Sequence, residues 1–554
     1  MIPTQDLPSL QFGKHELPDW LTGLRDHQWT ALLEIQAAFN EGAKIVWLDG
    51  PTGAGKTAIG ECARRIMRSG GLYVCSGLTL QDQFARDFQY AKVLKGRRNY
   101  PTLRMLEGLD DSTTDLCMKS GPDDGCFYCP GDSAEDMLCS YRIAKWEAAQ
   151  AELAVLNTTY LLYEANRKGA TFGQNSLVIA DECDELEGEL LGYTEFRMTR
   201  KQAEKLSVQI PKEKSHYATI AKWLDEQVVP MARMQLEELK GQGKSARVIE
   251  QRNQMQRLIG ASIRTAEELR VGGWVRDDNN YGTLILKPVS VARFGPGLLW
   301  DHGAKWLAMS ATIISPDQMS DDLGAGDLRQ ATVRVPMTFP VENRPIHYAA
   351  VADMTREGKA EGYPAALQAI VHLLRQHDGQ RVLIHAVSYE LTRYLVDGLT
   401  QYAVQGVLDV GDRRRKIITY LKSDQRESAI SRYRRTGNAV IVAPSLDRGV
   451  DFRDDDCRVV IVAKIPYPNL GDKQVGARLW DKETNGQRWY TTQTIRTLVQ
   501  MTGRGVRSED DHCVTYILDR SFSKIWRESK RLLPMWWREA VNDRFGSAYL
   551  RRPI

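Results

Sequence analysis

The chain has 554 residues, of which 42% are hydrophobic and 26% are charged, and its formal net charge is +3. This length predicts about three or four domains, and this composition is that of a soluble globular protein. No apolar run approaches the ~20 residues needed to span a membrane, and residues 1–6 lack the basic and apolar regions of a secretory signal. We therefore expect an intracellular protein with no membrane partner, cytoplasmic or nucleoid-associated, or nuclear in a eukaryote.

A glycine-rich loop follows the first buried strand, which is predicted for residues 44–49. Residues 50–57 match the pattern G-x4-G-K-T, and helix-forming residues follow from 58 to 68. The backbone N–H groups of such a loop close on phosphates, and the helix N-terminus adds a favourable dipole. The alternative is a chance glycine turn. We predict an ATP site in which Lys56 reaches the β/γ-phosphates, Thr57 holds Mg²⁺, and the remaining contacts come from Gly50, Thr52, Gly53, Ala54 and Gly55.

Four of the nine cysteines come next, in the pattern C-x8-C-x2-C-x9-C. Thiols gathered in so short a segment have metal-ligand spacing, and this spacing accepts either zinc or an iron–sulfur cluster. The alternative is a group of buried thiols. We predict that the metal ligands are Cys117, Cys126, Cys129 and Cys139.

An acidic pair follows another buried strand, predicted for residues 176–180. Open α/β sheets bind ligands at the carboxyl ends of their strands, where this pair would lie. We predict that Asp181 contacts Mg²⁺ and that Glu182 orients or deprotonates the attacking water. A solvated acidic loop is the alternative interpretation.

Residues 197–270 form a basic segment, with 15 Lys and Arg against 9 Asp and Glu. Apolar residues recur there at helical spacing, and Pro230 indicates a kink. The segment is either a helical insertion that contacts nucleic acid or an ordinary solvated helical hairpin.

The apolar run 306–309 leads into Ser310-Ala311-Thr312. The part of the chain after it predicts a second βαβ domain, with parallel strands expected at 381–386, 439–443, 458–462 and 513–518.

Near the end of the chain, the segment 500–507 reads QMTGRGVR. Arg504 and Arg507 lie three residues apart and would share one face of a helix. They are either arginine fingers that a second domain brings to the γ-phosphate or part of a solvated basic turn.

In this order, segments 50–57, 181–184, 310–312, 447–452 and 500–507 resemble those of superfamily 2 helicases, and most of all the XPD/DinG family of iron–sulfur DNA helicases. Further likenesses are the adenine-reading segment 25–28, the backbone-contacting segment 79–83, the cluster lead-in 95–100, the cluster tail 139–144 and the arginine motif 503–511. The chain departs from the family in three places. Cys117 stands 17 residues after Tyr100 rather than directly after it, Asp184 replaces the usual histidine, and Asp26 replaces the usual proline.

The resemblance implies an α/β fold with two RecA-like parallel-sheet motor domains, and with an iron–sulfur module and a helical arch inserted in the first. It implies a [4Fe–4S] cluster on the four cysteines, and it adds Gln500, Arg504 and Arg507 to the catalytic residues and Arg25, Gln28, Gly449 and Asp451 to the nucleotide site. The expected boundaries are 1–95, 147–188 and 301–338 for the first motor domain, 96–146 for the cluster module, 189–300 for the arch and 339–554 for the second motor domain.

We therefore expect an ATP-dependent DNA helicase that moves 5′→3′ on single-stranded DNA and unwinds forked DNA, as a monomer. Its expected cofactors are ATP, Mg²⁺ and the [4Fe–4S] cluster. One alternative is an RNA-directed ATPase of the same superfamily. Another is a zinc-stabilised nucleic-acid clamp that ATP switches between binding states.

Overall fold

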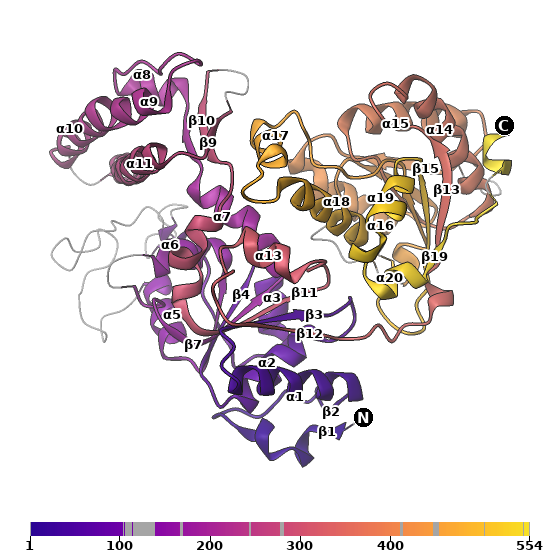
Figure 1. Cartoon of the computed structure of the whole chain (residues 1–554), viewed down its shortest axis with the longest axis horizontal. Coiled ribbons are helices and arrows are strands. Elements are labelled where there is room, and N and C mark those ends of the chain that lie inside the picture. The colour runs from indigo at the N-terminus through magenta and orange to yellow at the C-terminus, as the bar shows by residue number, and fades with distance from the viewer. Residues whose placement is uncertain are drawn as a thin grey trace.

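The structure is a computed structural model. It describes residues 2–102, 105, 113–114, 139–166, 170–242, 245–277, 282–409, 414–446, 452, 454–503, 505–546 and 548–552. Figure 1 shows two lobes, each built on its own sheet, and a mostly helical insertion that projects from the first lobe. We call these parts lobe 1, lobe 2 and the insertion, which runs from residue 196 to residue 288. In the described part of the chain, no helix is long and apolar enough to cross a membrane.

Lobe 1 is built on a seven-stranded, wholly parallel sheet of order β12-β3-β11-β7-β4-β6-β5. Its strands are β3 (Ile45–Asp49), β4 (Gly71–Cys75), β5 (Lys92–Val93), β6 (Leu153–Asn157), β7 (Asn175–Asp181), β11 (Gly303–Ser310) and β12 (Gln330–Arg334). Its helices are α1 (Asp26–Asn40), α2 (Lys56–Ile66), α3 (Leu78–Asp87), α5 (Ser140–Gln150), α6 (Thr158–Ala165), α7 (Leu186–Thr194), α12 (Gly295–Leu298) and α13 (Pro316–Asp322). A two-stranded ribbon of β1 (Ile2–Pro3) and β2 (Gly23–Leu24) precedes them.

Both faces of this sheet are buried, which explains the continuous apolar runs of its strands. Val46 and Leu48 pack with α1 and α2 on one face, whereas Ile45 and Trp47 pack with the helices of the other face. Successive side chains of a strand point to opposite faces, so a strand with a helix layer on each side must be apolar at every position. The strands predicted at 44–49 and 176–180 are confirmed.

Lobe 2 repeats this architecture in a second seven-stranded parallel sheet of order β15-β16-β14-β17-β18-β13-β19. Its strands are β13 (Ile346–Ala352), β14 (Val382–His385), β15 (Lys416–Thr419), β16 (Ala439–Ala443), β17 (Val459–Val462), β18 (Val514–Asp519) and β19 (Val541–Asn542). Its helices are α14 (Lys359–Gln376), α15 (Tyr389–Val404), α16 (Arg426–Arg435), α17 (Lys473–Trp480), α18 (Gly486–Thr502), α19 (Phe522–Glu528) and α20 (Met535–Glu539). The predicted α/β fold with two RecA-like parallel sheets is therefore confirmed.

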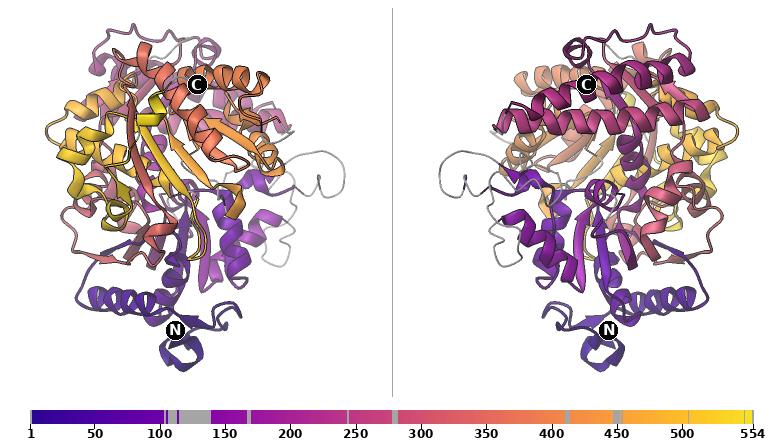
Figure 2. Two further views of the ribbon diagram at one scale, coloured as in Figure 1. Left: turned by 90° about the vertical axis from the view of Figure 1, so that its right-hand side faces the viewer. Right: turned by 90° about the vertical axis from the view of Figure 1, so that its left-hand side faces the viewer.

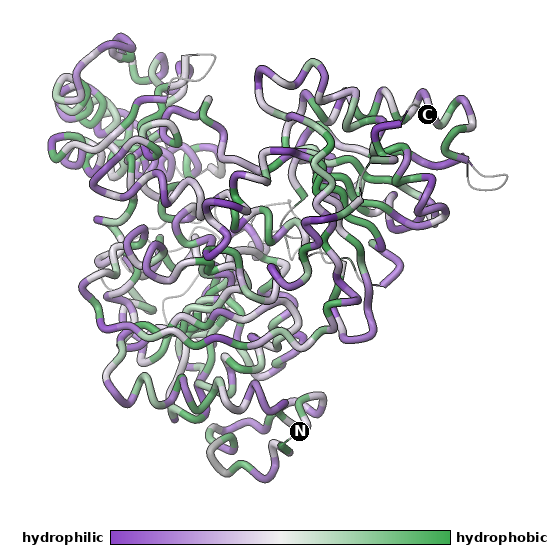
Figure 3. Tube along the Cα trace, turned by 45° about the vertical axis from the view of Figure 1, so that its right-hand side comes forward, coloured by the Kyte–Doolittle hydropathy of each residue, from purple (hydrophilic) through white to green (hydrophobic). Residues whose placement is uncertain are grey.

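The insertion joins a small antiparallel sheet to a layer of helices. Its strands are β8 (Phe196–Met198), β9 (Trp274–Arg276) and β10 (Leu284–Pro288), in the order β8-β10-β9, and its helices are α8 (Arg200–Lys205), α9 (Tyr217–Trp223), α10 (Val229–Lys240) and α11 (Ala246–Val271). Residues 224–228 form a π-helical turn that joins α9 to α10 without a break in the helical backbone, and Pro230 lies directly after this turn. A π-helical turn and a proline are both sites at which a helix can bend. Figure 2 shows the long helices of the insertion from the side, and Figure 3 shows that the apolar segments concentrate in the two sheets.

Candidate nucleotide site and the contacts between the lobes

The phosphate loop connects β3 to α2, and its glycines are required by both backbone conformation and close contact. Gly53 and Gly55 have φ of 83° and 78°, in the left-handed region that favours glycine. A Cβ on Gly53 would lie 2.2 Å from the ring of Phe339, and a Cβ on Gly55 would lie 2.3 Å from the amide nitrogen of Gln28. Each of these two glycines is therefore required both by its backbone conformation and by the side chain that packs against it.

The predicted phosphate-binding residues lie together in this loop. Lys56 begins α2, and its Nζ donates to the carbonyl of Gly50 at 3.1 Å. The N–H of Gly50 donates to the carbonyl of Ser310 at 3.1 Å, which ties the start of the loop to the end of β11. Thr52 is half-buried and Ala54 is buried.

The predicted adenine-reading segment packs directly on the loop. The N–H of Arg25 donates to Gln28 Oε1 at 2.8 Å, and Gln28 Nε2 donates to the carbonyl of Ala54 at 3.1 Å. Burial lowers the pKa of the neighbouring His27, and the carboxylate of Glu509 in lobe 2 acts in the opposite direction. The loop that carries Glu509 therefore lies near this edge of the nucleotide site.

The acidic pair lies at the carboxyl end of β7. Asp181 Oδ2 accepts a hydrogen bond from the hydroxyl of Tyr73 at 2.5 Å, and Asp181 Oδ1 accepts one from the N–H of Glu182 at 3.0 Å. Burial raises the pKa of Asp181, with Lys56 acting against that shift. Burial also raises the pKa of Glu182, and the negative charge of Asp184 adds to this effect. The Thr57 hydroxyl and the Asp181 carboxylate are the hard oxygen ligands that Mg²⁺ prefers, so the residues present fit the predicted cation.

Asp184 links the acidic motif to both the Ser-Ala-Thr segment and lobe 2. It accepts hydrogen bonds from Ser310 Oγ at 2.6 Å and from Thr312 Oγ1 at 3.1 Å. Gln500 Nε2, on α18 of lobe 2, donates to Asp184 Oδ2 at 2.8 Å and to Thr312 Oγ1 at 2.9 Å. Arg496, one turn earlier on α18, donates to the carbonyl of Thr312 at 3.1 Å. The aspartate that replaces the usual histidine therefore connects three motifs.

The structure corrects one prediction about the arginines. Helix α18 ends at Thr502 with Gly503 as its C-cap, so Arg507 lies in the following loop and not on a helix. Its N–H donates to Asp511 Oδ2 at 3.1 Å, and Asp511 is also paired with Arg458 at 2.6 Å. In this loop, Gly505 is required by close packing, because a Cβ there would lie 2.2 Å from Cys513 Sγ.

Several predicted residues lie outside the described part of the chain. They are Arg504, Gly449, Asp451, Cys117, Cys126 and Cys129. Cys139 is described and is buried at the N-terminus of α5. Among the described residues, no group of three or more His, Cys, Asp or Glu side chains is placed to hold a metal ion.

Lobe 2 also meets lobe 1 through a buried group of polar side chains. Arg478 on α17 pairs with Asp322 on α13, and their side chains are 1% and 3% exposed. From α18, Trp489 Nε1 and Gln493 Nε2 donate to the carboxylate of Glu187 on α7 at 2.9 Å and 2.7 Å. These side chains, together with the bonds from α18 to the Ser-Ala-Thr segment, form what we call the inter-lobe contact. No sequence motif marks Arg478 or Asp322, because a buried arginine in an amphipathic helix looks like a surface one.

The insertion touches lobe 2 through the first turn of α17, in what we call the insertion contact. Lys287 on β10 pairs with Asp472 at 2.8 Å, and Gln474 Nε2 donates to the carbonyl of the residue after β10 at 2.8 Å. Lys473 pairs with Glu213 at 3.1 Å. The insertion is continuous in sequence with lobe 1, and through these bonds it also contacts lobe 2.

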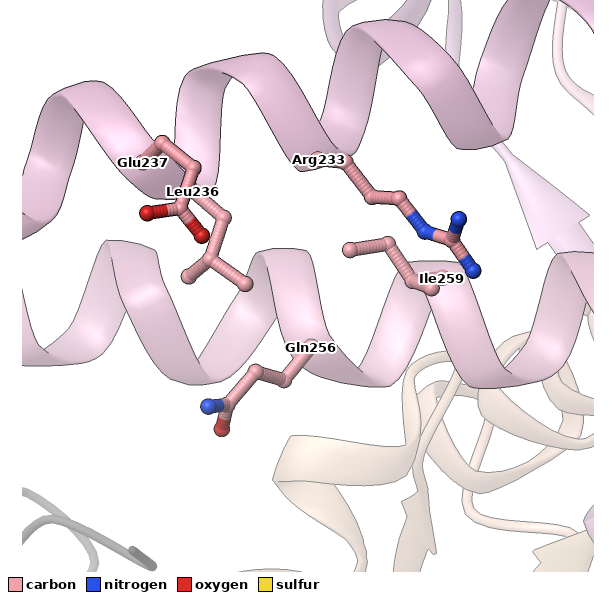
Figure 4. A pocket seen from close by; sticks show the side chains of 5 residues that line it. All are labelled: Arg233, Leu236, Glu237, Gln256 and Ile259. Carbon is pink, nitrogen blue, oxygen red and sulfur yellow. The ribbon is translucent and has the colours of Figure 1, made fainter.

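The basic side chains of the insertion are partly neutralised within it. Arg200 pairs with Glu204, and Lys240 pairs with Glu237. A groove between α10 and α11, shown in Figure 4, has no motif residue in its lining, which consists of Arg233, Leu236, Glu237, Gln256 and Ile259.

The chain matches two protein families. Residues 21–208 match the family described as type III restriction enzyme, res subunit, and residues 370–540 match the family described as helicase C-terminal domain. It is 24% identical over 255 residues to the ATP-dependent DNA helicase YoaA of Escherichia coli, which covers 44% of this chain and 38% of YoaA. It is 31% identical over 113 residues to the Fanconi anemia group J protein homolog of Gallus gallus, which covers 19% of this chain and 9% of that protein. The aligned part is thus less than two fifths of the length of either relative.

Solved structures show the same fold over nearly the whole chain. A solved XPD helicase has a TM-score of 0.61 at 16% identity and covers 92% of this chain and 98% of its own. The S. tokodaii Xpd4 structure has a TM-score of 0.55 at 13% identity and covers 94% and 99%. With its two parallel-sheet lobes, the motif order described above and these partial matches, the chain is similar to superfamily 2 helicases of the XPD/DinG type.

Proposed function

We propose that this chain is an ATP-dependent DNA helicase that moves 5′→3′ along single-stranded DNA and separates the strands of a fork. The observation that carries the proposal is the pair of bonds from Gln500 to Asp184 and Thr312. They connect lobe 2 to Asp184, which lies two positions after Glu182 of the acidic pair. A change at the nucleotide site therefore alters the position of lobe 2, as a motor requires.

The chain's own residues have separate parts in this scheme. Lys56 binds the β/γ-phosphates, and Glu182 accepts the proton of the attacking water. Arg504 and Arg507 of lobe 2 offset the charge that develops on the transferred phosphoryl group. Mg²⁺, which Thr57 and Asp181 would hold, neutralises charge on the phosphate oxygens.

Unwinding of forked substrates tests the proposal. The full chain with ATP should unwind a duplex that carries a 5′ single-stranded tail and should fail on one with only a 3′ tail. Glu182→Gln should bind ATP and unwind neither substrate. Stimulation of ATP turnover by RNA strands more than by DNA strands would instead assign an RNA-directed ATPase. ATP-dependent changes in strand binding without unwinding of either substrate would assign a nucleic-acid clamp.

We further propose that Cys117, Cys126, Cys129 and Cys139 hold a [4Fe–4S] cluster near the point of strand separation. The support is the resemblance of the segments on either side of these cysteines to the family pattern. Protein purified without oxygen should contain about four irons per chain. Cys139→Ser should lose that iron, whereas Cys62→Ser, which changes a buried thiol of α2, should retain it. One bound zinc and no iron would overturn the cluster proposal and leave the motor proposal intact.

A further inference from the structure

Tyr73 has a position in the nucleotide site that no motif predicts. It lies on β4, beside β7 in the sheet, and its side chain is 1% exposed. Its hydroxyl donates to Asp181 Oδ2 at 2.5 Å, and the side chain of Thr57 acts on the pKa of the same phenol from close by. One phenol group thus binds one of the two side chains predicted to hold the cation and lies near the other.

The directions of these hydrogen bonds suit a cation site. A phenol oxygen carries one proton and can also accept a hydrogen bond. Because the proton of Tyr73 points to Asp181, the phenol has no proton left to donate to the neighbouring Thr57 hydroxyl. The phenol therefore does not compete for the lone pairs of Thr57. The two oxygens of Asp181 are oriented, one by Tyr73 and the other by the N–H of Glu182.

The ring of Tyr73 is held in place by the core of lobe 1. It packs against Phe84 of α3 with a centroid separation of 3.9 Å, and Phe84 packs in turn against Phe88 at 4.8 Å. A fully packed ring cannot turn without displacing its neighbours. The phenol oxygen is therefore a fixed point from which the Asp181 carboxylate is oriented.

We propose that Tyr73 is a positioning residue that aligns the Asp181 carboxylate for the divalent cation of the nucleotide complex. The inference rests on the proposed function, because it requires a metal–nucleotide site between β3 and β7. Residues that orient metal ligands from outside the ligand set contribute about 10- to 100-fold to metal affinity. The hydroxyl of Tyr73 should therefore act on the cation and leave the metal-free nucleotide complex unchanged.

Tyr73→Phe tests this inference, since it removes one hydroxyl and keeps the ring. ADP binding to the full chain is measured across a Mg²⁺ titration and again in excess chelator. The Mg²⁺ concentration that half-saturates the effect on ADP affinity should rise about tenfold or more, while ADP affinity in chelator stays within about twofold. The matched control is Tyr90→Phe, which removes a phenol that donates to Glu61 at 2.7 Å in the same lobe and should shift neither value.

Each outcome decides between the two proposals. If the wild-type chain binds no ADP, both the nucleotide-site proposal and the role of Tyr73 are overturned. If it binds ADP with no Mg²⁺ dependence, the nucleotide site stands and the role of Tyr73 is overturned. If the wild-type chain depends on Mg²⁺ and Tyr73→Phe depends on it equally, only the role of Tyr73 is overturned. If Tyr73→Phe loses ADP affinity in chelator as well, the phenol supports the fold of lobe 1 rather than the cation site, which also overturns the inference.

Discussion

The inter-lobe contact and the insertion contact both use helix α17, but they differ in burial. In the first, Arg478 and Asp322 are 1% and 3% exposed, whereas in the second, Lys473 and Glu213 are 47% and 66% exposed. A buried charge that loses its partner has no water to replace it, while an exposed pair exchanges its partner for water at little cost. The Arg478–Asp322 pair therefore holds lobe 2 to lobe 1 strongly, whereas the Lys473–Glu213 pair can be exchanged for solvent. The Lys287–Asp472 pair is intermediate, at 13% and 32% exposed.

The pKa values of the carboxyl groups in the two contacts are also shifted in opposite directions. Burial raises the pKa of Asp322 to about 7, and the negative charge of Glu187 adds to this effect against the attraction of Arg478. Desolvation acts in the same direction on Asp472, but the hydrogen bonds from Lys287 and from the N–H of Gln474 outweigh it and lower the pKa of Asp472. Desolvation therefore decides the direction of the pKa shift of Asp322, whereas hydrogen bonds and attraction decide that of Asp472.

Replacing Arg478 with Met should have the largest effect when stability is measured above about pH 7, where Asp322 is ionised, because the carboxylate is then buried without its cation. The free energy of unfolding, measured by chemical denaturation, should fall by about 3–5 kcal/mol. The double change Arg478→Met with Asp322→Leu should recover much of this loss, since no unpaired charge remains. The control is Arg488→Met, which removes a bond from the same lobe to Ser315. A loss of less than about 1 kcal/mol for Arg478→Met would place this contact with the exposed ones.

Gln500→Ala tests the functional part of the inter-lobe contact. It removes the hydrogen bonds that Gln500 donates to Asp184 and Thr312. The loss of a hydrogen bond to a charged group changes a rate or an equilibrium constant by about tenfold or more. DNA-stimulated ATP turnover should fall by this factor, while the affinity for ATP changes little, because the bonds that are removed go to Asp184 and Thr312 rather than to the phosphate loop. Gln487→Ala, at an exposed position of the same helix, should leave turnover unchanged. Equal effects of the two substitutions would contradict the coupling between the lobes.

Stability as a function of pH separates the two contacts. The folded-state pKa of Asp322 lies above its usual value, so the folded chain keeps a proton that the unfolded chain has released. Its contribution is therefore full at low pH and is lost as the pH rises from about 4 to about 7. The pKa of Asp472 is lowered, so its contribution is present above its usual value and is lost as the pH falls.

Thermal midpoints measured between about pH 4 and pH 8 should show this difference. Asp322→Asn should flatten the decline of stability toward neutral pH, and Asp472→Asn should not. If the Asp322→Asn profile runs parallel to that of the wild-type chain, Asp322 is ionised like a surface carboxylate.

The smallest effect is expected for the exposed pair of the insertion contact. Lys473→Glu alone, and Lys473→Glu together with Glu213→Lys, should both leave the unfolding midpoint unchanged at about 0.15 M salt, because solvent and ions screen exposed charges. Repeating the measurement at low salt should reveal a small loss in the single variant and a recovery in the double one. A loss as large as that of Arg478→Met would mean that the insertion is fixed to lobe 2 after all.

The sequence alone was sufficient wherever the chemistry is local. The phosphate loop was predicted from its glycines because two of them must adopt left-handed backbone conformations, and the strand before it from its continuous apolar run. The acidic pair was placed at a strand end because a continuous apolar run also precedes it. The helix predicted for Arg504 and Arg507 was wrong for Arg507, because the pattern of charges did not reveal that Gly503 ends the helix and that Gly505 packs against Cys513.

What the sequence determined by itself is the set of motifs and the two parallel sheets, since backbone preference and hydrophobic pattern are written in neighbouring residues. What only the tertiary structure decided is which of these residues meet. Gln500 and Asp184 are 316 residues apart in the chain and 2.8 Å apart in space, and Tyr73 reaches Asp181 across 108 residues. Such contacts depend on how whole helices and strands pack, and no local pattern distinguishes a tyrosine or an arginine that is buried by that packing from one that remains in solvent.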